Sequence, residues 1–273
     1  MLSQVEVLSD QGTTLILPVG EDSNGYYVKD IDGIDPVSAS LSSSSFGQLD
    51  GEVEQGARRE KRNIILTVGL EPDYITRTVS QMRRELYTYF MPKSKVRLRF
   101  VSDDLETVII QGTVEDMDAP PFTSDPQAVI SIVCYKPDFL SLIETTLPGS
   151  STSAAVDTVL NYPGSVDAGF LFQLNPNRSI TGFVINQTLP DSSQRTLEFQ
   201  YPMVSGDILL LSTVAGNKFA TLTRSSTLKS VVGGVSPQAD WLQLAPGSNK
   251  LRVSIAGAAI PFSIKYTSRY GGL

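Results

Sequence analysis

Residues 62–101 read RNIILTVGLEPDYITRTVSQMRRELYTYFMPKSKVRLRFV, and this stretch decides the fold because its apolar period changes twice. In residues 64–70 an apolar side chain recurs at every second position, which is typical of a strand with one buried face. From Ile75 to Phe90 apolar side chains recur three or four positions apart, which predicts an amphipathic helix. Residues 95–101 alternate again. We therefore predict strand, helix and strand in this order.

The helix has candidate boundaries at both ends. Glu71, Pro72 and Asp73 supply an acidic start with an early proline, which predicts that the helix begins at residue 73. Pro92 cannot donate a backbone hydrogen bond, so we expect the helix to end at residue 90. The predicted apolar face consists of Ile75, Val79, Met82, Leu86, Tyr89 and Phe90. We find no other strong helical pattern, so we expect this helix to cover a sheet.

Further strands are predicted around this core. Residues 4–18 form a hairpin pattern about a turn at Asp10, and residues 106–115 form another strand pattern. Residues 127–135 are apolar on both faces, so we expect a central strand that is covered on both sides. Residues 38–62 are polar and rich in serine, glycine and mixed charge. They indicate a flexible loop or an extended hairpin arm that reaches a neighbouring subunit.

The length of 273 residues favours two domains. Residues 145–155 are small and polar, so we place the boundary there and predict domains at 1–145 and 146–273. The second domain shows no helical periodicity. Its short β-prone runs are 158–162, 169–174, 180–186, 196–201, 207–212, 218–223, 241–244, 250–255 and 262–267. Runs at this spacing predict an antiparallel β-sandwich, so the whole chain is expected to be mainly β with one helix.

Composition excludes several classes of site. The chain has no histidine, which excludes Ser-His-Asp catalysis, an imidazole base and a histidine-bound zinc. Its single cysteine excludes an internal disulfide and a cysteine zinc site. We predict no catalytic, metal or cofactor site, with a two-carboxylate glycosidase as a distant alternative. No run of 18 apolar residues and no secretory signal is found, so membrane insertion and secretion are not expected.

Three smaller features have a functional and a structural interpretation. Asp116 and Asp118 beside Glu115 could form a carboxylate pair or a calcium site, but without EF-hand spacing a solvated loop is favoured. Trp241 could stack on a sugar, although packing in a core or at an edge is the commoner use. Cys134 lies in an apolar strand, which favours a buried and inert side chain.

The net charge of −7 is unevenly distributed. Residues 1–145 hold 13 basic and 23 acidic residues, or −10, which leaves 9 basic and 6 acidic residues, or +3, for residues 146–273. This balance argues against a general nucleic-acid binder. Charges of both signs lie close together at the end of the polar tract. They are consistent with a solvated arm and with complementary pairing to another subunit, and both interpretations stay open. The candidate interface residues are Glu52, Glu54, Arg58, Arg59, Lys61 and Arg62.

Two ordered sets of motifs resemble one family. The N-terminal set is the polar arm, Arg62-x-Ile64-x-Leu66, a helix that ends in Leu86-x-x-Tyr89-Phe90, and a strand that closes in Cys134-x-x-Pro137. The C-terminal set is GFVIN at 182–186, Ser205-Gly206-Asp207, Trp241-x-x-Leu244-x-Pro246-Gly247-x-Asn249 and Arg269-Tyr270-Gly271-Gly272. Together they resemble the distal tail proteins (Dit) of siphophages, over almost the whole chain.

This resemblance implies a fold and a function. The expected fold is an N-terminal split β-barrel-like domain related to tail-tube proteins, followed by a C-terminal galectin-like β-sandwich. The expected function is structural: six copies form a ring that joins the tail tube to the tail-tip hub. The implied partners are the chain itself as a homohexamer, the tail tube protein, the tail-tip hub protein and receptor-binding proteins, with DNA only in transit. The implied location is the distal end of the virion tail, after assembly in the host cytoplasm.

Two alternatives remain open at this stage. The first is a carbohydrate-binding adhesion module that contacts host-surface glycans through Trp241 or the tyrosines. The short intervals between the predicted C-terminal strands leave no room for an inserted sugar-binding domain, which counts against direct sugar binding. The second is a tail-tube subunit, which would polymerise rather than stop at one ring. The acidic half suits a conduit, because like charge keeps DNA from adhering.

Overall fold

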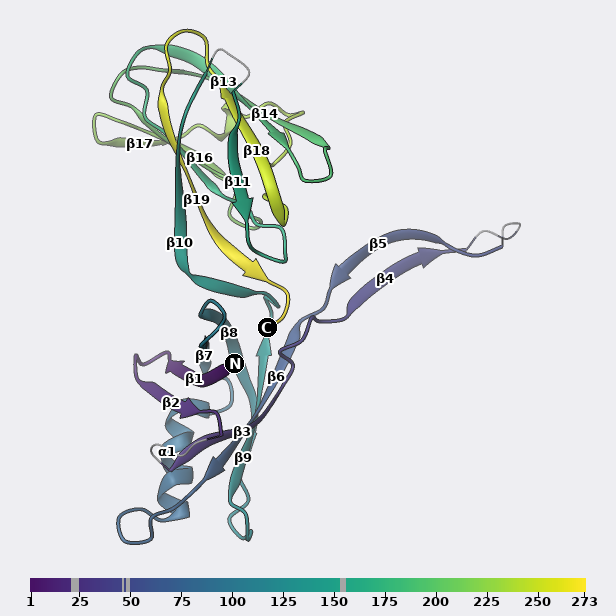
Figure 1. Ribbon diagram of the computed structural model, residues 1–273, viewed down its shortest axis with the longest axis vertical. Coiled ribbons are helices and arrows are strands. Elements are labelled where there is room, and N and C mark those ends of the chain that lie inside the picture. Colours follow the sequence, from purple (N-terminus) through teal and green to yellow (C-terminus); the bar gives the residue numbers. More distant parts are fainter. Residues whose placement is uncertain (21–24, 46, 48–49, 153–155) are drawn as a thin grey trace. The chain divides into compact units, whose positions relative to one another are not determined.

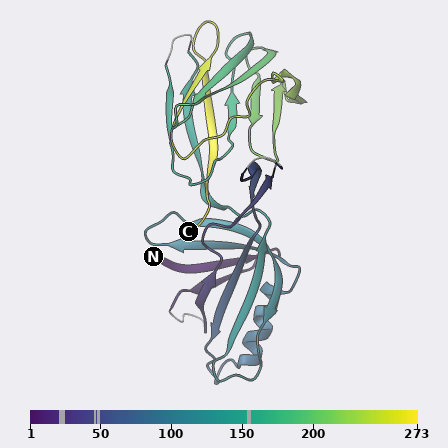
Figure 2. The ribbon, with the colours of Figure 1, turned by 90° about the vertical axis from the view of Figure 1, so that its right-hand side faces the viewer.

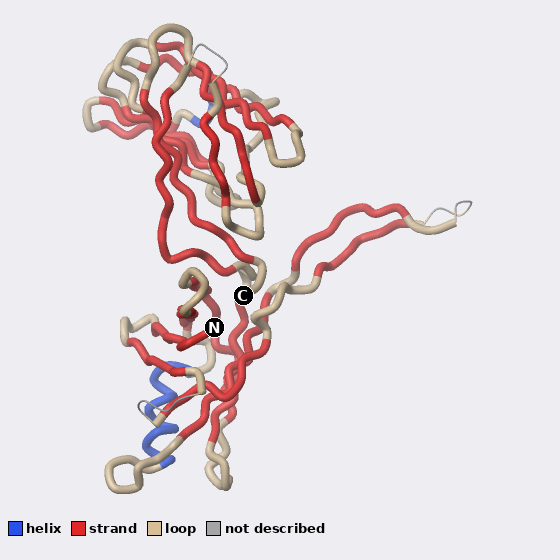
Figure 3. Tube along the Cα trace, in the orientation of Figure 1, coloured by secondary structure: helices blue, strands red, loops and turns tan. Residues whose placement is uncertain are grey.

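The stretch at 62–101 folds as β6 (Arg62–Leu70), α1 (Val79–Phe90) and β7 (Lys95–Ser102) in this computed structural model. The structure describes residues 1–20, 25–45, 47, 50–152 and 156–273. Over this part of the chain there is one α-helix, and Figure 3 shows that most of the elements around it are strands. The prediction of a mainly β chain with one α-helix is confirmed.

The helix begins later than predicted. Its N-cap is Thr78, whose hydroxyl oxygen accepts from the Gln81 amide at 3.4 Å, while the Gln81 side chain accepts from the Thr78 amide at 2.8 Å. This reciprocal pair satisfies backbone donors that a helix start leaves free. Asp73 instead closes a turn by accepting from the Ile75 amide at 3.1 Å. Ile75 is 94% exposed, so its assignment to the apolar face is wrong.

The buried face of α1 is formed by Met82, Leu86 and Phe90, as the helical spacing predicts. Figure 2 shows the helix lying against the sheet of the N-terminal part of the chain. These three side chains join one hydrophobic cluster with the inward residues of the surrounding strands, such as Val5 and Leu66. The burial of these apolar side chains stabilises the helix, because a helix of 12 residues is marginal on its own.

The chain divides into two compact parts, which we call unit 1 and unit 2. Unit 1 comprises Met1–Leu142 and Tyr270–Leu273, and unit 2 comprises Ile143–Arg269 (Figure 1). The sequence places one boundary at 145/146 and does not predict that the last four residues return to unit 1. Each unit has its own hydrophobic cluster of buried residues.

Unit 1 contains one antiparallel sheet in the order β2-β1-β7-β8-β9-β6-β3. Besides β6 and β7, its strands are β1 (Leu2–Ser9), β2 (Thr14–Pro18), β3 (Tyr26–Asp32), β8 (Val108–Asp118) and β9 (Gln127–Cys134). A single parallel bridge between Val19 and Val28 connects the two ends of this order. The sheet therefore comes close to a closed barrel around its apolar cluster.

Strand β9 lies between β6 and β8, so its predicted central position is confirmed. It is not covered on both faces. Val129 is 36% exposed, and the Ser131 hydroxyl donates to Asn63 and Glu115 on the outer surface. Of the outward apolar residues, Val133 is 5% exposed, so the outer face is covered only near the end of the strand, and Val129 reflects β-propensity rather than burial.

Unit 2 consists of two antiparallel sheets around one core. One sheet has the order β17-β16-β15-β12-β19-β10, and the other has the order β11-β18-β13-β14. The strands are β10 (Phe139–Ser150), β11 (Thr158–Tyr162), β12 (Leu171–Leu174), β13 (Ile180–Thr188), β14 (Gln194–Met203), β15 (Ile208–Ser212), β16 (Phe219–Arg224), β17 (Thr227–Ser230), β18 (Gly247–Ser254) and β19 (Pro261–Tyr270). The rings of Phe172 and Phe183 connect the two sheets, with their centres 5.3 Å apart, and Phe183 stacks on Phe199 of the neighbouring strand at 5.2 Å.

Eight of the nine β-prone runs predicted for the second half contain a strand, and one does not. Residues 241–244 form no strand, and only Leu244 pairs, through an isolated bridge to Ala168. The sequence also misses β10 and β17, while the short helix η1 (Val232–Gly234) follows β17. Strand β10 was missed because its polar second half reads as a connection.

The polar tract folds as a separate hairpin, which we call the arm. Its strands are β4 (Ala39–Ser44) and β5 (Val53–Arg59), and among the described residues they pair only with each other. Figure 1 shows the arm leaving the sheet of unit 1. Of the two interpretations of the tract, the structure therefore has the hairpin arm. No helix in the described part of the chain is long and apolar enough to span a membrane.

Candidate functional site: the arm and its anchor

The arm buries very little of its own surface. All seven residues of β5 are exposed, including Val53 at 48%. On β4, Leu41 is 70% exposed. The register runs from Ala39 opposite Arg59 to Ser44 opposite Val53, with one bulge between Ser42 and Ser43. An isolated two-stranded hairpin is at best marginally stable in water. The arm therefore contributes little to the stability of its own chain.

Charge along the arm is separated into two ends. Residues 38–57 contain three acidic residues, Asp50, Glu52 and Glu54, and no lysine or arginine. We call residues 50–54 the arm tip. The basic residues come afterwards, at residues 58–62, which we call the arm root. The arm therefore presents an acidic tip and a mainly basic root.

Arg59 connects the root to unit 1. Its guanidinium forms a two-pronged contact with the carboxylate of Asp138: Nη1 donates to Oδ1, and Nη2 donates to Oδ2 at 3.0 Å. The side chain of Asp138 is 3% exposed, and that of Arg59 is 39% exposed. A forked pair of this kind fixes orientation as well as distance. It therefore fixes the last residue of β5 relative to the chain between β9 and β10.

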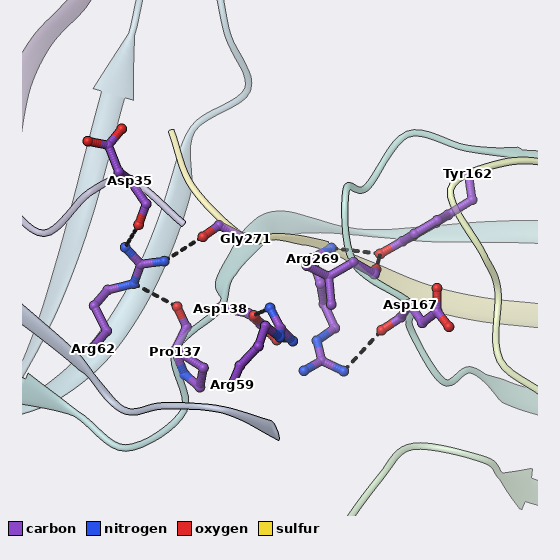
Figure 4. A network of polar contacts seen from close by, with 10 residues as sticks. Asp35, Arg59, Arg62, Pro137, Asp138, Tyr162, Asp167, Arg269 and Gly271 are labelled. Atoms are coloured by element: carbon purple, nitrogen blue, oxygen red, sulfur yellow. Dashed lines mark hydrogen bonds and ion pairs between the residues drawn. The ribbon is translucent and has the colours of Figure 1, made fainter. Parts of the chain in front are cut away.

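Arg62, the first residue of β6, is a buried connector. Nε donates to the Pro137 carbonyl at 2.7 Å, and Nη1 donates to the carbonyls of Asp35, at 2.6 Å, and Gly33. Nη2 donates to the Gly271 carbonyl at 2.5 Å (Figure 4). Arg62 therefore joins the segment before the arm, the segment after β9 and the C-terminal residues of unit 1.

The surroundings of Arg62 explain how a buried cation is tolerated. The side chain is 1% exposed, and its guanidinium carbon lies 4.4 Å from the centre of the Phe139 ring. Burial lowers the pKa of Arg62 from its ordinary value, but the guanidinium stays charged at neutral pH. Gly33 has a φ of +83°, and a Cβ there would lie 1.9 Å from the Asn63 carbonyl oxygen. Only glycine therefore fits this bend.

The structure divides the six predicted interface residues into two sets. Glu52, Glu54, Arg58 and Lys61 lie at the surface; Glu52 accepts from Ser43, and Arg58 lies 3.7 Å from Glu60. Arg59 and Arg62 instead bind Asp138 and the backbone carbonyls of unit 1, and we call these contacts the anchor of the arm. Arg62 is 1% exposed, so the structure gives it a place inside unit 1, and the interface role of these residues stays a prediction. The sequence analysis missed Asp138 and Gly33. Asp138 could have been noticed as a charged residue just after a predicted strand, and Gly33 as a glycine in a short segment that also contains Pro36.

The other candidate residues have structural environments. Glu115 accepts from Ser131 at 3.0 Å, and Asp116 accepts from the Met117 amide at 2.9 Å. Within the described ranges, no group of three histidine, cysteine, aspartate or glutamate residues could hold a metal ion. Burial raises the pKa of Cys134 to about 11, so this thiol stays protonated. Lys218 Nζ lies 5.0 Å from the centre of the Trp241 ring.

Comparison with known proteins gives one family-model match, over the C-terminal part of the chain, and a structural match over most of it. Residues 163–270 match the family model described as a siphovirus-type tail component, C-terminal domain. The fold resembles the crystal structure of the Dit protein of phage SPP1, with a TM-score of 0.68 and 15% identity over 97% of this chain and 98% of that one. That SPP1 protein is described as a paradigm of the hub of the adsorption apparatus in phages that infect Gram-positive bacteria.

Two further comparisons qualify this result. The structure of the phage P2 baseplate in its activated conformation with calcium matches with a TM-score of 0.45 and 10% identity, over 97% of this chain and 98% of that one. This likeness is too slight to support an argument. No curated protein matches the sequence. The function of the arm must therefore be inferred from its own residues.

Proposed function

We propose that this protein is a siphophage distal tail protein (Dit) that forms a hexameric ring, joins the tail tube to the tail-tip hub and lets DNA pass at ejection. In this proposal unit 1 is the ring-forming, split β-barrel-like domain, and unit 2 is a galectin-like β-sandwich outside the ring. The chain would contact the tail tube protein, the tail-tip hub protein and receptor-binding proteins. The motif order and the near-closed sheet of unit 1 support these assignments.

The exposed arm is the observation that carries the proposal. A hairpin with two unpaired edges is a template for contact with another chain. The arm is nevertheless joined firmly to unit 1 through Arg59 and Arg62, so the structure fixes its root, while β4 and β5 pair with no other strand in the described part of the chain. A fixed root and an uncovered arm are what an element needs to reach a neighbouring copy.

Ring closure requires two different patches on each copy. In a head-to-tail contact, one patch of a subunit binds the other patch of the next, and a suitable rotation closes the ring. The arm supplies one such patch, with Glu52, Glu54, Arg58 and Lys61 at its surface. The excess of acidic residues in residues 1–145 suits a ring whose bore must not retain DNA.

The test is the mass of the purified full chain by light scattering, followed by negative-stain images. We expect a mass of six chains and single rings. Open-ended tubes would favour a tube subunit and contradict the ring. A monomer at every concentration, together with binding on a glycan array that Trp241→Ala abolishes, would favour the adhesion module. The contact of Lys218 with the Trp241 ring is against that outcome, because one ring face is already occupied.

A further inference from the structure

Unit 1 has a groove between β8 and the chain that joins β9 to β10. Its volume is about 410 Å³, and its lining includes Lys95, Gln111, Thr113, Tyr135, Lys136 and Leu140. Tyr135 is 73% exposed and Leu140 is 40% exposed, so the groove offers apolar surface as well as charge. Asp138, the carboxylate that holds Arg59, lies in its wall. The groove therefore adjoins the arm root.

The groove exists because the ladder on one side of β8 is interrupted. Strand β8 pairs with β9 from Thr113 onward, and it pairs with β10 only at Ile109 and Val108. Between these pairs, three residues of β8 face six residues of the neighbouring chain, at 134–139. The longer segment must bow outward over this distance, and residues 110–112 keep a ladder partner only on the β7 side. The gap is therefore built into the register.

The charged side chains at the groove that have no ion-pair partner in the described part of the chain are positive. Lys95 and Lys136 line it, and Arg97 lies opposite Gln111 in the register of β7 and β8. All three side chains are exposed and form no ion pair within the part of the chain that the structure describes. The negative charge of Asp138 is matched by Arg59. The groove thus has two unpaired lysines in its lining, with Arg97 beside it, next to an apolar surface.

We propose that this groove receives the acidic arm tip of a neighbouring copy. The tip has the complementary properties: Asp50, Glu52 and Glu54 are exposed, and Val53 between them is 48% exposed. Complementary potentials of this kind fix partner and register at an interface. The inference rests on the proposed ring and specifies its contact: each copy inserts its tip into the next copy and receives a tip beside its own root.

The occupant is a second copy rather than the same chain. From the pair Ala39–Arg59 to the pair Ser44–Val53, β4 advances five residues, which is about 17 Å at the rise of a strand. The groove shares Asp138 with the root, so a straight hairpin holds its own tip away from its own groove. A tip that cannot reach its own groove is available to another copy.

The experiment is a charge swap in the full-length protein, with ring formation measured by light scattering over a concentration series. The tip variant is Glu52→Lys with Glu54→Lys, and the groove variant is Lys95→Glu with Lys136→Glu. We expect each to raise the concentration needed for half assembly by roughly tenfold or more, and the combination of all four to restore it. Lys229→Glu with Lys250→Glu, on unit 2, is the matched control and should assemble normally. Circular dichroism verifies folding of every variant.

The outcomes separate this inference from the proposed function. Recovery in the fourfold variant supports the tip-to-groove contact. Loss of assembly in both variants without recovery would overturn that contact and leave the arm as an interface with another acceptor. Unchanged assembly in the groove variant alone would also overturn it. A wild-type protein that forms no ring would contradict the proposed function itself.

Discussion

The guanidinium of Arg62 holds together three segments of unit 1 that are far apart in the sequence. Its acceptors lie up to 29 residues before it, and 75 and 209 residues after it. Each carbonyl would lose its hydrogen bond if the donors were removed, and an unsatisfied buried polar group is costly. Arg62 is thus a structural residue of unit 1 at the base of the arm.

We predict that Arg62→Met destabilises unit 1 by about 3 kcal/mol or more, because methionine keeps much of the volume but supplies no donor. Urea unfolding followed by circular dichroism measures this change. Arg58→Met is the control at an exposed position of the root and should change the free energy of unfolding by less than about 0.5 kcal/mol. Equal effects of the two substitutions would show that the buried contacts of Arg62 are unimportant.

Sequence reasoning could not have found this role. Arg62 ends a run of charged residues, Arg58, Arg59, Glu60 and Lys61, which is typical of a solvated surface. Its burial follows from the alternation of β6, in which Arg62 shares the inward face with Ile64 and Leu66. The alternation was visible, but the carbonyl acceptors come from remote segments. Only the tertiary fold shows that a cation at this inward position is satisfied.

Asp207 is a second buried charge, in unit 2. It is 2% exposed, and Arg224 donates to it from Nε at 2.8 Å and from Nη2 at 2.6 Å. The Val204 amide donates to it at 2.8 Å. The pKa of Asp207 is lower than its ordinary value, and the hydrogen bonds from Arg224 are the largest cause. The ionised Asp207 therefore stabilises folded unit 2 at every pH above the ordinary aspartate pKa of about 3.9. This stabilisation is lost as the pH falls through the lower pKa that Asp207 has in the folded state.

We predict that Asp207→Asn lowers the free energy of unfolding of unit 2 by roughly 1.5–3 kcal/mol at pH 7, and that this difference shrinks as the pH falls below about 4. The fluorescence of Trp241, the single tryptophan of the chain, reports unfolding of unit 2 in urea. Asp167→Asn, at an exposed position, should show neither effect. A difference that stays constant from pH 7 to pH 3 would contradict the linkage.

At the scale of elements, helix α1 shows which signals in the sequence are reliable. The apolar spacing correctly gave Met82, Leu86 and Phe90 as the buried face. The start was wrong because Glu71-Pro72-Asp73 resembles a helix start, while the capping box Thr78-x-x-Gln81 lies five residues later. Both signals are local, and the second is distinguished by the reciprocal hydrogen bonds that it forms. The strands at β1, β2, β6 and β9 followed their alternation.

We predict that Thr78→Ala destabilises unit 1 by about 1 kcal/mol, since it removes the side-chain acceptor for the Gln81 amide. Urea unfolding by circular dichroism measures the change, and amide exchange of residues 79–82 should quicken. Ser80→Ala, at an exposed position in the first turn, is the control, and we expect it to be neutral or slightly stabilising. If Asp73→Ala had the larger effect, the helix would begin where the sequence analysis first placed it.

At the scale of the whole molecule, the arm and the two units are different kinds of structure. Each unit is stabilised by its own buried cluster, which is the property that alternation and apolar spacing reveal. The arm has no such cluster, so its composition could only indicate a loop or a hairpin. The function of the arm could not be predicted from the sequence either. The groove that we propose as its acceptor exists because the ladder between β8 and its neighbours is interrupted. Such a gap leaves no pattern in the sequence.

The arm should therefore be removable without loss of the fold. Ala39 lies opposite Arg59, so residues 40–58 can be replaced by Asn-Gly, a two-residue turn suited to joining paired strands. This variant keeps the Arg59–Asp138 pair and every contact of Arg62, whose partners lie outside the deletion. We expect the melting temperature of the monomer to change little and ring formation to be lost. Replacing the same residues while also changing Arg59 to Ala should instead destabilise unit 1, because a buried carboxylate loses its partner. Rings formed by the first variant would mean that the subunits meet through another surface.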